Sequence, residues 1–176
     1  MYPMLSYKLY KPNVDLFLHR INQPLLNHNI NSMQFDDDGI RARKLLVIKD
    51  GIFKNYIASK RFADYLGVEP TGPIGVFEMK HGSKSKAELY KPKELMYEIV
   101  SFSSFVPNWV SGDFAAEVRL GYMIKNNKKV PFKGGMFVGN MFDMMKDMWL
   151  SKETVKLPGY HGPAVIRFEK GIVSGD

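Results

Sequence analysis

The sequence LLVIKDGIFKNY, at residues 45–56, sets the first expectation for the fold. Two runs rich in β-branched and aromatic residues flank Asp50-Gly51. A two-residue turn of this kind needs positive φ, which glycine adopts readily. The stretch therefore predicts a β-hairpin. A second hairpin is predicted from residues 114–125 and 129–132, joined by Asn126-Asn127.

Turn and cap residues place the remaining elements. Strands are predicted at residues 74–79, 87–90 and 163–173. Helices are predicted at 60–66 between Ser59 and Gly67, at 93–100 with Pro92 in the first turn, and at 141–150 behind Asn140. Many short strands with few helices predict an α+β fold, mainly antiparallel β, barrel-like or sandwich, with about three short helices.

The expected last helix carries a stripe of apolar residues. Its members follow the i, i+3, i+4, i+7, i+8 spacing of one helical face and are Met141, Met144, Met145, Met148 and Trp149. Packing into the core is the favoured interpretation. A flexible methionine surface that fills a partner's groove is the alternative.

The first 34 residues differ in character from the rest. They contain Pro3, Pro12, Pro24 and the asparagine-rich residues 27–31, and show no regular period. An irregular lead-in segment is predicted for residues 1–34, and a β-rich domain for residues 35–176.

Composition excludes several classes of protein. The 176 residues include no cysteine, so disulfides, thiolate metal sites and cysteine nucleophiles are absent. No signal peptide or apolar run of membrane-spanning length is visible, so a cytoplasmic location without membrane contact is expected. The net charge is +7, but basic and acidic residues are interleaved. A solvated surface is favoured over nucleic-acid binding.

The search for chemistry finds isolated groups rather than a complete site. No two of the four histidines have the i, i+4 spacing of a zinc helix, and His161 alone is kept as a weak candidate metal ligand. The run Asp36-Asp37-Asp38-Gly39 is interpreted as an Asx turn. A calcium loop would need carboxylates at Gln34 and Leu45. Ser111-Gly112-Asp113 is interpreted as a turn.

Seven segments stand in an order that can be compared with a known family. They are Phe35-Asp36-Asp37-Asp38-Gly39; Ile48-Lys49-Asp50-Gly51-Ile52; residues 63–67 with Thr71-Gly72; Ser111-Gly112-Asp113-Phe114; residues 121–127; Val138-Gly139-Asn140; and Val173-Ser174-Gly175. In this order they resemble motifs of the C-terminal domain of the TldD/PmbA family, known as modulators of DNA gyrase and as metallopeptidases. The chain departs from the family pattern at Pro73-Ile74-Gly75 and at Ala115, where the family has serine.

The resemblance implies a β-rich domain that pairs with an N-terminal α/β domain. In catalytic members that other domain carries a His-Glu-x-x-x-His helix, whose histidines bind the metal and whose glutamate is the general base. A cysteine near the C-terminus completes the family's site. This sequence has neither the helix nor the cysteine, so no metal ligand is carried over. No cofactor is expected in this chain, and zinc is expected in a complete catalytic homologue or partner.

Two origins are compatible with these differences. The chain is either a piece of a longer TldD/PmbA-type metallopeptidase or a non-catalytic partner subunit. Both origins imply a domain inactive alone that shapes a peptide cleft and an oligomer interface in proteolysis or peptide maturation. The expected partners are a TldD-like subunit in a homo- or hetero-oligomer such as a dimer, or a missing N-terminal domain, together with a peptide substrate.

The resemblance also selects candidate site residues. Those expected at the peptide cleft or its supporting turns are Thr71, Gly72, Gly112, Asp113, Phe114, Gly139 and Asn140. Taken singly, each is equally well interpreted as an ordinary turn residue. Two rival functions are a basic nucleic-acid-binding module related to gyrase modulation, and a small hydrolase that uses His161 with Asp113.

Overall fold

The computed structural model describes residues 16–19, 33–73, 75–91, 95–126 and 128–175. The chain divides into two compact units and passes between them three times. The first unit contains Met1–Ser83 and Leu150–Val165. The second contains Lys84–Trp149 and Ile166–Asp176. Each unit is built around its own main sheet.

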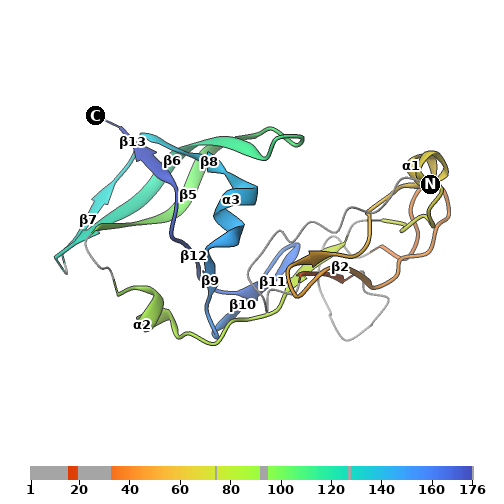
Figure 1. Cartoon of the computed structure of the whole chain (residues 1–176), viewed down its shortest axis with the longest axis horizontal. Helices are drawn as coiled ribbons and strands as arrows, with labels where there is room; N and C mark the ends of the chain where they lie inside the picture. The colour runs from red at the N-terminus through yellow and green to blue at the C-terminus, as the bar shows by residue number, and fades with distance from the viewer. Residues whose placement is uncertain (1–15, 20–32, 74, 92–94, 127, 176) are drawn as a thin grey trace. The chain divides into compact units, whose positions relative to one another are not determined.

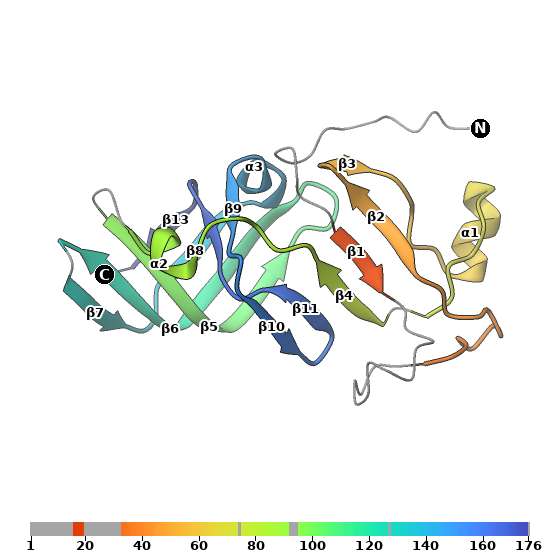
Figure 2. The same ribbon diagram turned by 90° about the horizontal axis from the view of Figure 1, so that it is seen from below.

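The first unit is a six-stranded sheet in the order β10-β11-β4-β1-β2-β3 (Figure 2). The strands are β1 (Leu16–His19), β2 (Leu45–Lys49), β3 (Ile52–Phe53), β4 (Val76–Met79), β10 (Thr154–Leu157) and β11 (Tyr160–Pro163). All neighbours are antiparallel except β11 and β4. β1 lies within the segment predicted to be irregular, so residues 16–19 correct that prediction. The remainder of residues 1–32 lies outside the described part, and the boundary at residue 34 stays a prediction.

The hairpin predicted around Asp50-Gly51 is confirmed. β2 and β3 pair antiparallel with Lys49 opposite Ile52. Asp50 has φ 50° and Gly51 has φ 73°, which places both central residues in the left-handed region that a primed turn requires. Val47 and Ile48 of this hairpin are buried.

The first predicted helix is also confirmed, as α1 (Lys60–Leu66). Gly67 ends it in the left-handed conformation with φ 64°, and the amide of Val68 donates to the carbonyl of Ala63 at 3.0 Å. Ser59 occupies the N-cap position, but its side chain makes no capping hydrogen bond. Ala63 is fully buried and anchors the helix.

The second unit is built on a sheet in the order β13-β8-β6-β5, with β7 also paired to β6 (Figure 1). Its strands are β5 (Leu95–Pro107), β6 (Asp113–Lys125), β7 (Lys128–Phe132), β8 (Met136–Asn140) and β13 (Ile172–Ser174). A separate pair is formed by β9 (Met148–Leu150) and β12 (Ile166–Phe168). β6 is the central strand, because β5 covers one side while β8 and β7 share the other. The hairpin predicted around Asn126 is therefore confirmed.

The assignments around residue 90 are wrong and must be exchanged. The predicted strand at 87–90 is largely the helix α2 (Lys86–Leu89), and residues 95–100 of the predicted helix belong to β5. A capping box explains α2, since the Ser85 hydroxyl accepts from the amide of Glu88 while the Glu88 carboxylate accepts from the amide of Ser85. β5 is a strand because it pairs with β6 along its length. Residues 92–94 lie outside the described residues.

A half-buried carboxylate network accompanies the start of β5. The Tyr90 hydroxyl donates to Glu98 at 2.6 Å, and the Lys129 ammonium lies 2.6 Å from the other carboxylate oxygen. Burial, followed by the hydrogen bond to Glu98, raises the pKa of Tyr90 to about 12. Burial opposes ionisation of Glu98, but hydrogen bonds from Lys129 and Tyr90 outweigh it and lower the Glu98 pKa. The network holds α2's end, β5 and β7 together.

Two further predictions are corrected at the C-terminal end. The helix expected at 141–150 ends early, as α3 (Met141–Lys146) with Asp147 as its C-cap, and the last three residues form β9. The strand expected at 163–173 is divided among the end of β11, β12 and β13. Asn140 caps α3 as predicted, accepting from the amide of Asp143 at 3.2 Å.

For Met144, at the centre of the methionine stripe, core packing is the correct interpretation. Met144 is 2% exposed and packs with Phe114 and Ala116, while Phe137, Met141 and Phe168 lie against that group. The predicted α+β class, mainly antiparallel with three short helices among the described residues, is confirmed. Among the described residues each of the two larger sheets stays open rather than closing into a barrel. In the described ranges no helix combines the length and apolar character needed to cross a bilayer.

Removal of the Met144 side chain tests this core. Met144→Ala is expected to lower the free energy of unfolding by about 2–5 kcal/mol, because it removes buried contacts and leaves a cavity. Met145→Ala, on the same helix but partly exposed, should cost clearly less. Urea denaturation followed by circular dichroism measures both, and equal losses would contradict this packing.

Candidate functional site

Five of the seven predicted site residues lie together at one end of the second unit. β6 and β8 pair with Asp113 opposite Asn140 and Phe114 opposite Gly139. The carbonyl of Gly112 accepts from the amide of Met141 at 2.8 Å, which joins the turn before β6 to α3. The Asn140 cluster is defined here as Ser111, Gly112, Asp113, Phe114, Gly139 and Asn140.

The Asn140 side chain connects the parts of this cluster. Its amide nitrogen donates to the Asp113 carboxylate at 2.8 Å and to the carbonyl of Ser111 at 2.9 Å. Its amide oxygen accepts from the backbone amide of Asp143 at 3.2 Å. One side chain therefore fixes the turn before β6, the end of β8 and the first turn of α3.

Asp113 is an exposed carboxylate held in its ionised form. The Ser111 hydroxyl donates to it at 2.7 Å, and Asn140 donates to its other oxygen. The hydrogen bond from Ser111, followed by that from Asn140, holds the pKa of Asp113 below its ordinary value. Asp143, the nearby carboxylate in α3, is paired with Lys146 at 2.6 Å, and the pKa of Asp143 is lowered mainly by that contact.

Aromatic side chains pack against the buried residue of the cluster, Phe114. Phe114 is buried, and its ring lies 5.5 Å from that of Phe105 and 5.2 Å from that of Phe137. A Cβ on Gly139 would lie 2.8 Å from the Met144 sulfur, and the Phe114 ring is also in contact. Glycine at 139 therefore lets the strand approach the core closely.

Thr71 and Gly72 belong to the first unit and support a different turn. Thr71 is 1% exposed, and its hydroxyl bonds both the amide and the carbonyl of Ala58 at 3.1 Å. Gly72 has φ 70°, and a Cβ there would lie 2.8 Å from the carbonyl oxygen of Arg41. Both are required by the local backbone, and they belong to the first unit, whereas the Asn140 cluster belongs to the second.

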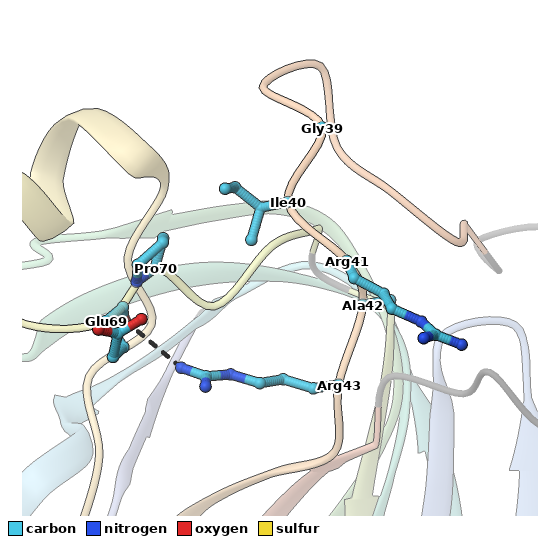
Figure 3. Close-up of a pocket in the computed structure, with 7 residues that line it drawn as sticks. All are labelled: Gly39, Ile40, Arg41, Ala42, Arg43, Glu69 and Pro70. Carbon is cyan, nitrogen blue, oxygen red and sulfur yellow. Dashed lines mark hydrogen bonds between the residues drawn. The ribbon is translucent and has the colours of Figure 1, made fainter.

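A shallow surface hollow near Gly72 was not anticipated. Its volume is about 420 Å³, and it is lined by Gly39, Ile40, Arg41, Ala42, Arg43, Glu69 and Pro70 (Figure 3). The Arg43 guanidinium points across it toward the carbonyl of Glu69 at 3.5 Å. Its two walls are distant in the sequence, so no local motif indicates it.

The acidic turn beside this hollow is the predicted Asx turn. The Asp36 carboxylate accepts from the amides of Asp38 at 3.1 Å and Ile40 at 2.8 Å. Gly39 has φ 73°, and its amide donates to the carbonyl of Asp36. The carboxylate is used to stabilise the turn, as this interpretation requires.

His161 lies on β11, with Lys156 opposite it on β10 and Glu78 opposite it on β4. Asp113, its suggested partner in a hydrolase, belongs to the second unit and hydrogen-bonds there to Ser111 and Asn140. No group of three histidine, aspartate or glutamate side chains that could hold a metal occurs among the described residues. The ligand set for zinc is thus not met by the part of the chain that the structure describes.

Comparison with known proteins gives a consistent family. The model of the family described as "PmbA/TldA metallopeptidase C-terminal domain" matches residues 4–175 of this chain. A zinc metalloprotease TldD homolog from Saccharolobus solfataricus is 27% identical over 150 residues, which covers 76% of this chain and 34% of that protein. The match favours the metallopeptidase family over the nucleic-acid-binding alternative.

Two solved structures share the fold. A proposed modulator of a DNA gyrase from Thermotoga maritima aligns with a TM-score of 0.75 and 22% identity, covering 92% of this chain and 39% of that one. TldE from Thermococcus kodakarensis aligns with a TM-score of 0.72 and 19% identity, covering 96% and 41%. The chain spans about a third of the length of the curated relatives that it matches.

Substitution of Gly72 tests the close approach in the first unit. A residue with a Cβ lowers the free energy of unfolding by about 1–2 kcal/mol when it must adopt the left-handed region. Gly72→Ala also brings a methyl group against the carbonyls of Ile40 and Arg41. Gly39→Ala is the matched control, because Gly39 has φ 73° and open space around its Cβ position. Thermal unfolding should show a clearly larger loss for Gly72→Ala. Equal losses would remove the steric argument.

Removal of the Ser111 hydroxyl tests the electrostatics of the cluster. Because the folded pKa of Asp113 is lowered, its contribution to stability is present above the ordinary value of 3.8 and is lost as pH falls through the folded value. Ser111→Ala should raise the Asp113 pKa toward 3.8, so less stability is lost over that acid range. Carboxyl titration by NMR measures the shift, with Ser104→Ala as the control. An unchanged Asp113 pKa would show that the hydroxyl is not its donor.

Proposed function

This chain belongs to the PmbA/TldA metallopeptidase C-terminal domain family, and we propose that it shapes a peptide cleft and a subunit interface in a TldD/TldE-type assembly. In this role the chain binds and orients, while the groups that cleave the peptide are supplied by a TldD-like subunit or by an N-terminal domain. The assembly acts in proteolysis or peptide maturation in the cytoplasm.

The Asn140 cluster is the observation that supports this role. It places fixed polar groups at the end of two paired strands, where the sheet and α3 hold them rigidly. Sites on turns held by a rigid scaffold are typical of binding surfaces. The exposed Asp113 carboxylate offers oxygen acceptors to a partner or a peptide. The glycines at 112 and 139 let the side chains of Phe142 and Met144 pack closely against the backbone of the cluster.

The metal enters this proposal only through relatives. Zinc is named in the S. solfataricus homologue, and in metallopeptidases it polarises the carbonyl and activates water. The described residues of this chain do not provide its ligands, so no step of hydrolysis is assigned to them. What remains for this chain is to position the peptide and the other subunit.

Metal analysis and a peptidase assay of the isolated chain test the proposal. The purified chain, supplied with zinc, is expected to retain far less than one zinc per molecule and to release no product from a mixture of fluorogenic peptides. The S. solfataricus TldD homologue serves as the positive control for the assay. Stoichiometric zinc together with turnover by this chain alone would refute the non-catalytic role.

A further inference from the structure

The turn that joins β5 to β6 is unusually well fixed for an exposed segment. The Asn108 side-chain oxygen accepts from the amides of Val110 at 3.0 Å and Ser111 at 3.1 Å. The Asn108 backbone closes the turn, donating to the carbonyl of Asp113 at 2.7 Å and accepting from the amide of Gly112 at 2.9 Å. In Figure 1 this green turn extends beyond the sheet on the side of α3.

Gly112 fastens the turn to α3. Its φ is 80°, and a Cβ there would lie 2.5 Å from the Phe142 ring, so the ring packs directly on the glycine. Phe142 itself stays 37% exposed. The turn therefore rests on an aromatic side chain that is open to solvent on its other side.

This fixed turn presents large apolar side chains to water. Trp109 is 87% exposed, Val110 is 91% exposed and Val106, at the end of β5, is 67% exposed. Single exposed apolar residues are ordinary, but a group of them on a rigid support marks an interaction surface. Tryptophan is among the residues that most often dominate the energy of such contacts. The apolar tip is defined here as Val106, Trp109 and Val110.

A negative charge lies at the end of the turn that carries the apolar tip, where the amide of Asn108 donates to the carbonyl of Asp113. Asp113 follows Trp109 by four positions, and the hydrogen bonds from Ser111 and Asn140 orient its carboxylate without neutralising it. Among the described residues no cation pairs with Asp113, whereas the neighbouring Asp143 is paired with Lys146. Asp113 and Asp143 lie close enough for their charges to interact, so the ionised Asp113 is the carboxylate of this pair that is left to attract a cation.

We propose that the apolar tip and Asp113 together bind an extended peptide segment in which an apolar side chain and an arginine or lysine lie within two positions of each other. The apolar side chain packs on Trp109 and Val110, and the cation pairs with Asp113. Charge complementarity selects this occupant, because an acidic segment would be repelled by Asp113. The inference rests on the proposed role in a peptide cleft and adds the class of peptide that the cleft prefers.

Binding of short labelled peptides to the full chain tests this preference. Four fluorescein-labelled hexapeptides carry Leu-Arg, Leu-Gln, Leu-Glu or Ser-Arg at their centre between glycine and serine residues, and fluorescence anisotropy gives the affinities. The Leu-Arg peptide is expected to bind most tightly. An exposed ion pair is worth up to about fivefold in affinity, so Asp113→Asn should weaken the Leu-Arg peptide by about three- to fivefold and abolish its advantage over Leu-Gln.

The apolar contact is tested by Trp109→Ala, which should weaken both the Leu-Arg and the Leu-Gln peptide by about tenfold or more. Tyr65→Ala and Asp38→Asn are the matched controls, since both side chains are exposed in the first unit, and neither should change binding. Circular dichroism establishes that each variant is folded.

The outcomes separate this inference from the function on which it rests. Peptides that bind with equal affinity whatever their central residues, or a preference for Leu-Glu, would overturn the inference and leave the peptide cleft standing. Selective binding that Trp109→Ala and Asp113→Asn do not alter would also overturn it, because the preference would arise elsewhere. If none of the four peptides binds to the chain, the peptide cleft itself is refuted.

Discussion

The candidate site depends on the hydrogen bonds of one group, the side-chain amide of Asn140. It donates twice, to Asp113 and to the carbonyl of Ser111, and it accepts once, from the amide of Asp143. An amide can do this because it has donors and an acceptor at fixed positions. The end of β8, the turn before β6 and the start of α3 are thereby held in one arrangement, and the Asp113 carboxylate is oriented as a consequence.

Glycine makes that arrangement sterically accessible. Phe142 packs on Gly112 and Met144 packs on Gly139, so both side chains lie closer to the backbone of the Asn140 cluster than a residue with a Cβ would allow. The same argument holds at Gly72 in the first unit, where backbone carbonyls take the place of the side chains. Close packing thus explains the glycines that resemble a family motif, and the polar side chains beside them, Ser111, Asp113 and Asn140, hydrogen-bond to one another.

The division of the chain into two units bears on function. The Asn140 cluster and the apolar tip lie in the second unit, whereas Thr71, Gly72 and His161 lie in the first. The chain also spans only about a third of its curated relatives. A role in positioning, with hydrolysis assigned to other parts of an assembly, agrees with a rigid strand end that offers one oriented carboxylate and exposed apolar side chains.

The sequence by itself determined the features that depend on a few neighbouring residues: the Asp50-Gly51 hairpin, the end of α1 at Gly67, the Asx turn at Asp36 and the cap at Asn140. Each follows from local dihedral preference or a hydrogen bond within about four residues, and the ordered motifs were sufficient to indicate the family. Only the tertiary structure decided that residues 95–107 form a strand, since that choice depends on pairing with β6. It also brought Asp113 to Asn140, 27 residues away, and left Trp109 exposed, because contacts between distant segments leave no local pattern in the sequence.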